Sequence, residues 1–271
     1  MSPACSRNTG MELDPLVYDS VPVSKPVMPI INEASGIADS KRNAGMLWVE
    51  EDSGSPSQLY LLGHDGKVVK QVFVKGVVNR DWEDMCLSAG KIYIGDIGDN
   101  AQVYNECIIY GFDEPSASVD TIDAVESIRF KYSDGPRDAE AFLVDGVTKD
   151  IFIITKRDNP ARIYKINYPY STSVLNTAIQ VGSLTYSGIV GAALSTDGKE
   201  IILKTYIGLQ YFKRGTGQSI ADALKNKYST LTYKPEPQGE AVCFAVDGSG
   251  FFTLSEKGFG SVVNLYFYPK K

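Results

Sequence analysis

Residues 141–155, AFLVDGVTKDIFIIT, contain two short apolar runs separated by a polar turn. Both runs are rich in β-branched and aromatic residues, which favour strands. The Asp145-Gly146 dipeptide between them supplies the positive backbone φ that a tight hairpin turn needs. The segment therefore predicts two antiparallel strands.

The same pattern recurs along the chain at intervals of about 45 to 60 residues, the range expected of propeller blades. Its second run lies at residues 46–49, 92–94, 151–154, 201–203 and 251–254. A third short run follows each of these, and usually a fourth. Four antiparallel strands per unit, repeated around a ring, form a β-propeller. The sequence thus predicts an all-β propeller with five blades, or six if one unit is degenerate, while a two-sheet sandwich fits the regular period less well.

The ends of the chain complete the predicted architecture. The last unit stops after its third run, so residues 16–23 (LVYDSVPV) are predicted to supply its outer strand and close the ring. Residues 1–15 are predicted to be an N-terminal tether, and residues 16–271 a single domain. The best helix candidate is 219–228, an insertion in the fourth blade that begins at a Ser cap.

Composition excludes several classes of protein. The chain of 271 residues is 43% apolar and 22% charged, which is typical of a globular domain and not of a disordered one. A net charge of −6 disfavours non-specific nucleic-acid binding. No apolar run approaches the roughly 18 residues of a membrane span. Because His64 is the only histidine, a His-based triad or a multi-histidine metal site is excluded.

Cysteine usage bears on localisation. Ser2-Pro3-Ala4-Cys5 resembles the end of a bacterial lipobox, although the apolar stretch that should precede it is missing. This match predicts export to the periplasm or cell surface, with Cys5 as the candidate lipid anchor. A monomer without a transmembrane segment is expected.

Polar residues gather where a propeller would bring them together. The start of a blade's first strand and the end of its second strand open on the same face. First-strand starts supply Glu33, Asp81, Trp82, Glu83, Asp84, Asp138, Glu140 and Glu240. Second-strand ends supply Asp52, Asp96, Asp99, Asn100, Lys156, Arg157, Lys204, Tyr206 and Glu256. Carboxylates crowded near one axis repel one another, so they require a cation, shared protons or basic neighbours.

These side chains divide into candidate roles. The candidate cation ligands are Asp81, Asp84, Asp96, Asp99 and Asn100. Calcium suits such hard oxygen donors, although their spacing is not that of an EF-hand. The candidate catalytic carboxylates are Glu33, Glu83, Glu140 and Glu240. The candidate ligand-binding residues are Asp52, Trp82, Asp138, Lys156, Arg157, Lys204, Tyr206 and Glu256.

Two readings of these charges stay open. The basic residues come from later units than most of the acidic ones, so the mouth suits a small anionic ligand bridged by a metal. Alternatively, the charges pair with one another and leave the mouth inert. Trp82 likewise either stacks on a sugar ring or packs between blades.

The ordered motifs resemble those of a bacterial family of exported or lipid-anchored propellers without an established activity. The motifs are EASG at 33–36, DWED at 81–84, GDIGDN at 95–100, DAEA at 138–141, TKR at 155–157, GEA at 239–241 and SE at 255–256. More distantly, the chain is similar to phytase-like, lactonase-like and NHL-type propellers. That resemblance implies calcium-assisted phosphate-ester or lactone chemistry at the mouth. The chain departs from most phytase-like and lactonase-like propellers in its predicted five blades, where those have six, and in Val190-Gly191-Ala192, where an acidic ligand is expected.

Three functions follow as alternatives. The first is a metal-dependent hydrolase of a small anionic or sugar-derived substrate. The second is a non-catalytic propeller that binds a glycan or protein at the cell surface. The third is a glycosidase that uses a carboxylate pair such as Glu33 and Glu140. Whether the protein is an enzyme is left open by the sequence.

Overall fold

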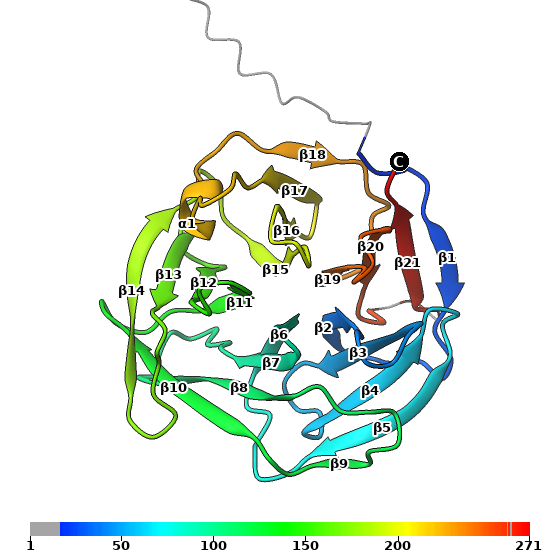
Figure 1. Cartoon of the computed structure of the whole chain (residues 1–271), viewed down its shortest axis with the longest axis horizontal. Helices are drawn as coiled ribbons and strands as arrows, with labels where there is room; N and C mark the ends of the chain where they lie inside the picture. Colours follow the sequence, from blue (N-terminus) through cyan, green and yellow to red (C-terminus); the bar gives the residue numbers. More distant parts are fainter. Residues whose placement is uncertain (1–16, 259, 261) are drawn as a thin grey trace, which may run out of the picture.

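Short antiparallel strands stand around a central axis in the computed structural model, which describes residues 17–258, 260 and 262–271 (Figure 1). Apart from one four-residue helix, every regular element in these ranges is a strand. The predicted all-β class is confirmed, and repeated sheets around one axis form a β-propeller. The predicted tether, with Cys5, lies outside the described residues.

The strands form repeated antiparallel units. The first unit consists of β2 (Ala34–Asp39), β3 (Met46–Glu51), β4 (Gln58–Gly63) and β5 (Val68–Val74), with β9 (Thr121–Ile122) parallel to β5. The second consists of β6 (Trp82–Ser88), β7 (Lys91–Asp96), β8 (Cys107–Asp113) and β10 (Glu126–Tyr132). The third consists of β11 (Ala139–Val144), β12 (Ile151–Thr155), β13 (Arg162–Ile166) and β14 (Asn176–Ser183).

Two further units complete the set. One consists of β15 (Ile189–Leu194), β16 (Glu200–Thr205), β17 (Gly208–Lys213) and β18 (Ser229–Leu231). The other consists of β19 (Ala241–Phe244), β20 (Gly250–Leu254), β21 (Asn264–Pro269) and β1 (Val23–Pro26). In addition, β10 pairs in parallel with β14, so the second and third units form one eight-stranded sheet.

The outer strand β1 differs from the predicted one. It begins at Val23, where the predicted stretch 16–23 ends, and it runs antiparallel to β21. Pro22 has no N–H to donate, and the ladder starts directly after it. Of the predicted stretch, Tyr18 makes an isolated bridge with Lys270, and Leu16 lies outside the described residues.

The helix α1 (Ile220–Ala223) is shorter than the predicted 219–228. Its N-cap is the predicted one, since the Ser219 hydroxyl accepts the Asp222 N–H at 3.1 Å. The chain turns after Ala223 and becomes extended again at Ser229, where β18 (Ser229–Leu231) begins. Nowhere in the described part of the chain does a helix have the length and apolarity that a bilayer span requires.

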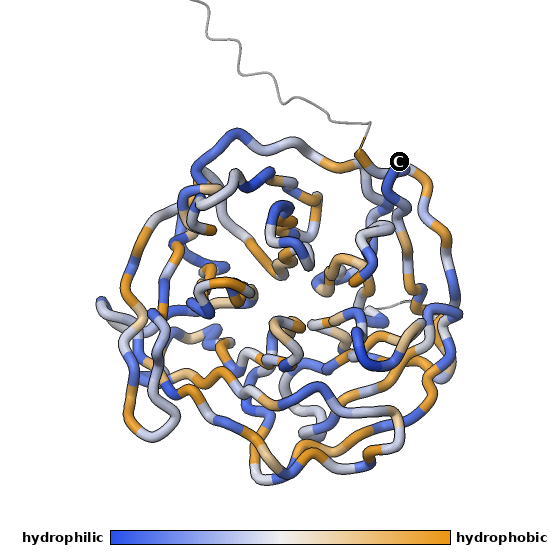
Figure 2. Tube along the Cα trace, viewed as in Figure 1, coloured by the Kyte–Doolittle hydropathy of each residue, from blue (hydrophilic) through white to orange (hydrophobic). Residues whose placement is uncertain are grey.

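Apolar side chains fill the spaces between neighbouring units, so the core is divided into layers. Trp48 and Trp82, for example, are buried in a cluster that joins the first and second units. Figure 2 shows apolar stretches along the strands and polar ones at many of the turns. The inner strands are thereby held rigidly around the axis, and their ends position the site.

Candidate functional site at one mouth of the channel

Antiparallel pairing places the start of each unit's first strand beside the end of its second. Ala34 pairs with Glu51, Trp82 with Asp96 and Ala139 with Thr155. The same arrangement recurs in the last two units, where Ile189 pairs with Thr205 and Ala241 pairs with Leu254. The polar strand ends of all five pairs therefore open on one face.

A β-bulge at the start of the first strand recurs in four of these pairs. The register skips one residue in each, namely Ser35, Glu83, Glu140 and Val190. A bulged residue is left out of the ladder, and the bulge re-aims its side chain. Glu240 directly precedes β19 at the corresponding place. Three acidic residues and one serine thus occupy equivalent positions around the mouth.

Three carboxylates converge between the first and second units. One oxygen each from Asp52, Asp81 and Glu83 lies within 4.8 Å of the others. The backbone of Gly98 lies against them, because a Cβ there would lie 2.1 Å from Glu83 Oε1 and 2.4 Å from Asp81 Oδ2. Only glycine leaves room for these oxygens. We call Asp52, Asp81 and Glu83 the acidic triad.

The acidic triad has an elevated affinity for protons. Burial raises the pKa of Glu83 well above its usual range, and the nearby carboxylates of Glu140, Asp52 and Asp81 raise it further. Burial is also the main cause of the raised pKa values of Asp52 and Asp81. A bound cation would relieve the same repulsion that protons now relieve.

A hydrogen-bonded chain crosses the rest of the mouth. The Ser35 hydroxyl donates to Glu240 Oε2 at 2.9 Å, and the Tyr206 hydroxyl donates to Glu240 Oε1 at 2.6 Å. Lys156 Nζ donates to the Tyr206 oxygen at 3.2 Å and also contacts Glu140 Oε1. We call these five residues the mouth chain. It links side chains from four different units.

Two carboxyl groups of the mouth have pKa values near neutrality. Burial raises the pKa of Glu140 to about 8, with a further contribution from Glu240 and an opposing one from Lys156. Burial and the neighbouring carboxylates of Glu240 and Glu33 raise the pKa of Glu256 to about 8. Glu140 Oε2 is buried and has no hydrogen-bond partner among the described residues.

The predicted cation ligands are not all brought together. Asp99 accepts the N–H groups of Val103 at 3.0 Å and Tyr104 at 2.7 Å, so it closes its own loop. Asp96 accepts the Asp81 N–H at 3.0 Å, and its carboxylate lies 3.5 Å from Arg80 Nε.

Asp84 and Asn100 also have other contacts. Asp84 is fully buried and accepts the N–H groups of Met85 and Phe142 at 2.9 and 3.1 Å. The Asn100 side chain contacts Arg157. Asp81 alone of the five predicted cation ligands belongs to the acidic triad, which also includes one predicted ligand-binding residue and one predicted catalytic residue.

Four of the predicted ligand-binding residues are engaged elsewhere. Trp82 is fully buried in the core. Lys204 Nζ donates to Glu236 Oε2 at 2.6 Å, beneath the surface. Arg157 Nε lies 2.8 Å from Asp138 Oδ2, which neutralises that carboxylate. Of the basic side chains predicted at the mouth, Lys156 is the one in the mouth chain.

Glu50 is a residue that sequence reasoning missed. Its side chain is fully buried on β3, and neither carboxylate oxygen has a hydrogen-bond partner in the described structure. Burial, with Asp52 and Asp84 nearby, raises its pKa well above the usual range. A Cβ at Gly36 would lie 2.6 Å from Glu50 Oε1, so the EASG glycine makes room for this carboxyl group.

Comparison with known proteins gives a fold and no family. No protein-family model matches the chain, and no curated protein matches its sequence. A luciferin-regenerating enzyme of known structure is similar with a TM-score of 0.54 at 11% identity, over 92% of this chain and 95% of that one. An auxiliary nutrient binding protein from Bacteroides thetaiotaomicron is similar with a TM-score of 0.52 at 8% identity, over 93% and 73%. At such identities the likeness concerns the fold alone.

Proposed function

We propose that the protein is a five-bladed propeller, closed by β1, that binds Ca²⁺ at the acidic triad and hydrolyses a small anionic or sugar-derived substrate. A phosphate ester or a lactone fits this description. The observation that carries the proposal is the convergence of three carboxylates within 4.8 Å. Neither neighbouring cation pairs with the acidic triad, since Arg80 contacts Asp96 and Lys156 contacts Glu140.

The donor set fits a hard divalent cation. All three groups offer carboxylate oxygens, and Ca²⁺ takes six to eight oxygen ligands in flexible geometry. Three protein ligands leave positions for water and substrate. When bound, the cation supplies positive charge that attracts an anionic substrate and polarises its scissile bond.

The mouth chain supplies the remaining functions. The Lys156 ammonium group binds the anionic part of the substrate. Glu140 is partly protonated near neutral pH because its pKa is about 8, so it gives a proton to the leaving oxygen and later accepts one from water. Ser35 and Tyr206 hold Glu240 in place from two sides. Burial and Glu240 raise the pKa of Tyr206, which therefore stays a donor.

Asp81→Asn tests the cation site. We expect it to lower Ca²⁺ affinity by about 100-fold, since even the groups that support metal ligands contribute 10- to 100-fold. Isothermal titration of chelator-treated protein measures this affinity. Asp123→Asn is the matched control, because Asp123 is exposed beside β9 at the outer edge. The same samples are assayed on p-nitrophenyl phosphate and on a set of small lactones. Equal turnover with and without Ca²⁺ would contradict the proposal.

Gly98→Ala tests the acidic triad without removing a charge. The new methyl group would displace the Glu83 and Asp81 carboxylates, which lie 2.1 and 2.4 Å from the Cβ position. We expect loss of Ca²⁺ binding with an unchanged circular dichroism spectrum. Gly45→Ala is a useful control for stability because a Cβ there meets nothing within 4 Å, although its φ of +76° adds some strain. Retention of full Ca²⁺ affinity in Gly98→Ala would show that the cation binds elsewhere.

The second candidate function is non-catalytic binding of a glycan. In this case the protein would be exported and would act at the surface of a bacterium. This function is favoured by the lip of the mouth, where Tyr206 is 40% exposed and its neighbour Ile207 is 95% exposed. An aromatic ring beside a charged mouth suits the face of a sugar. Thermal stabilisation by glycans, with no turnover of any ester or lactone, would favour this function over hydrolysis.

A further inference from the structure

The opposite end of the central channel holds a separate cavity. The inner strands begin at the charged mouth and end at this cavity, as β6 shows: Glu83 lies at the mouth, whereas Met85 and Cys86 line the cavity. The cavity has a volume of about 310 Å³ and is formed by the C-terminal halves of the five inner strands and the turns that follow them. No member of the acidic triad or the mouth chain lines it.

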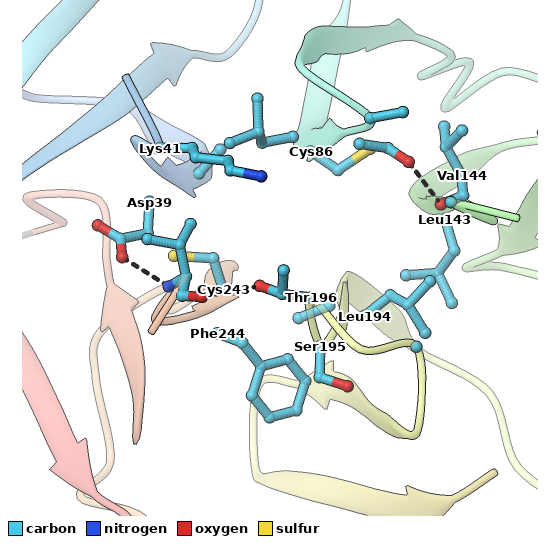
Figure 3. Close-up of a pocket in the computed structure, with 18 of the residues that line it drawn as sticks. Asp39, Lys41, Cys86, Leu143, Val144, Leu194, Ser195, Thr196, Cys243 and Phe244 are labelled. Carbon is cyan, nitrogen blue, oxygen red and sulfur yellow. Dashed lines mark hydrogen bonds between the residues drawn. The ribbon is translucent and has the colours of Figure 1, made fainter. Parts of the chain in front are cut away.

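The wall of this cavity is largely apolar. Figure 3 shows Leu143, Val144, Leu194 and Phe244 around the opening, together with the Cys86 thiol. Burial raises the pKa of this thiol, so it behaves as a small apolar group. A wall of this kind accommodates the hydrocarbon part of a ligand, and the volume lies at the small end of the range for ligand pockets, about 300 to 1,000 Å³.

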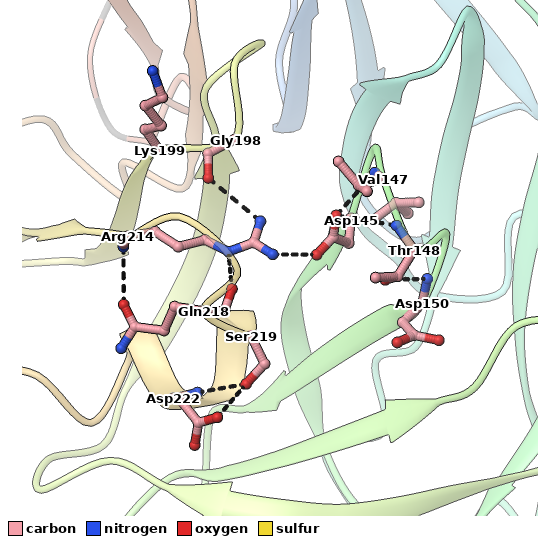
Figure 4. Close-up of polar contacts among 12 residues, drawn as sticks. Asp145, Val147, Thr148, Asp150, Gly198, Lys199, Arg214, Gln218, Ser219 and Asp222 are labelled. Carbon is pink, nitrogen blue, oxygen red and sulfur yellow. Dashed lines mark hydrogen bonds and ion pairs between the residues drawn. The ribbon is translucent and has the colours of Figure 1, made fainter.

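The acidic groups at the rim already have partners. Asp39 accepts the Val246 N–H at 2.8 Å, and its other oxygen lies 2.7 Å from His64 Nε2. Asp145, at the first Asp-Gly turn discussed above, pairs with Arg214 at 2.6 Å (Figure 4). Asp197, the third acidic residue that lines the cavity, accepts the Ser195 hydroxyl at 2.7 Å and the Lys199 N–H at 3.1 Å. The three carboxylates are therefore held by the protein itself.

Lys41 is different from these acidic groups. It is exposed and makes no ion pair within the described ranges, and its side chain extends from the rim toward the opening in Figure 3. One ammonium group therefore stands over an apolar cavity whose neighbouring acids are engaged. This combination selects for a negative charge attached to an apolar body.

We propose that this cavity binds a small apolar carboxylate, with its hydrocarbon part between the inner strands and its carboxylate at Lys41. A medium-chain acyl carboxylate or an aryl carboxylate has the required size and charge. The site is independent of the function proposed for the charged mouth, since the two share no residue.

Octanoate is a suitable probe, and octanol is its uncharged counterpart. Isothermal titration should show octanoate binding at least tenfold more tightly than octanol. Lys41→Glu should weaken octanoate binding at least tenfold and leave octanol binding unchanged. Lys75→Glu is the matched control, because Lys75 is exposed and does not line the cavity. Asp81→Asn should bind octanoate normally.

Equal affinity for octanoate and octanol would overturn the proposal. So would an unaltered affinity in Lys41→Glu or the absence of millimolar binding.

Discussion

Replacement of Lys204 by methionine is expected to lower the free energy of unfolding by about 3 to 5 kcal/mol, the usual cost of removing one partner from a buried ion pair. Lys204 is fully buried, and its Nζ lies 2.6 Å from Glu236 Oε2 and 3.0 Å from the Ala241 carbonyl oxygen. Methionine fills nearly the same volume, so the loss reflects charge and not a cavity. Denaturation in urea, followed by tryptophan fluorescence, measures it.

A second substitution separates the charge effect from general disruption. Glu236 also accepts a hydrogen bond from the Thr253 hydroxyl at 2.6 Å. Glu236→Gln keeps this hydrogen bond and removes the carboxylate charge that Lys204→Met leaves unpaired. The double variant Lys204→Met/Glu236→Gln should recover much of the lost stability. Lys199→Met, at an exposed site, should change stability by less than about 0.5 kcal/mol. A loss below about 1 kcal/mol in Lys204→Met would contradict the assignment of this pair as a strong contact between the last two units.

The fold could be predicted because its signals are local. Short apolar runs joined by turns, as in residues 141–155, specify hairpins within about fifteen residues. The positive φ of that turn lies at Lys149 and not, as predicted, at Gly146. The outer strand of the last unit was harder to place, because β1 pairs with β21 across more than two hundred residues. The sequence correctly indicated that an N-terminal segment supplies this strand. The pairing with β21 determines that the strand begins at Val23.

The site was predicted as a region and only partly as a set of contacts. Strand ends place polar residues on one face, and this much follows from topology. The direction of each side chain depends on the bulges at Glu83 and Glu140, which shift the residues between faces. The GDIGDN motif suggested cation ligands, but short-range backbone N–H groups take the carboxylate of Asp99. Loop carboxylates often accept such bonds, and sequence alone does not show which do.

The apolar cavity at the far end of the channel had no comparable signal. Its wall consists of ordinary strand residues such as Leu143 and Val144, whose pattern is the same as that of the core. A cavity arises from the distance between inner strands, which depends on how the blades pack and on the small residues at Ala192 and Ala193. The Asp-Gly turns around it predicted hairpins and gave no indication of a ligand.

Stability in chelator should fall as pH rises from about 5 to about 8. Burial raises the pKa of Glu140 from 4.5 to about 8, so between these values the folded chain holds a proton that the unfolded chain has released. Protonation of Glu140 therefore stabilises the folded state at low pH. This stabilisation is lost as the pH rises through the pKa that Glu140 has in the folded state. One unit of pKa shift corresponds to about 1.4 kcal/mol of stability. In a domain of this size, 1 kcal/mol changes the unfolding temperature by about 2–4 °C. We therefore expect the unfolding temperature to fall by about 5 °C or more from pH 5 to pH 8.

Calcium should reduce only the part of the pH dependence that comes from the acidic triad, because a bound cation replaces protons as the partner of Asp52, Asp81 and Glu83, while Glu140 keeps its own proton. Thermal scans at pH 5 and pH 8, with chelator and with Ca²⁺, measure both effects. Glu140→Gln should reduce the pH dependence in chelator, since the amide stays neutral throughout, while Glu256, whose pKa is also raised to about 8, still contributes. Glu126→Gln should retain it, because Glu126 is exposed and pairs with Lys91 at the outer strands. A wild-type unfolding temperature that rises from pH 5 to pH 8 in chelator would show that the mouth carboxylates do not share protons, and Ca²⁺ binding would then need a different cause.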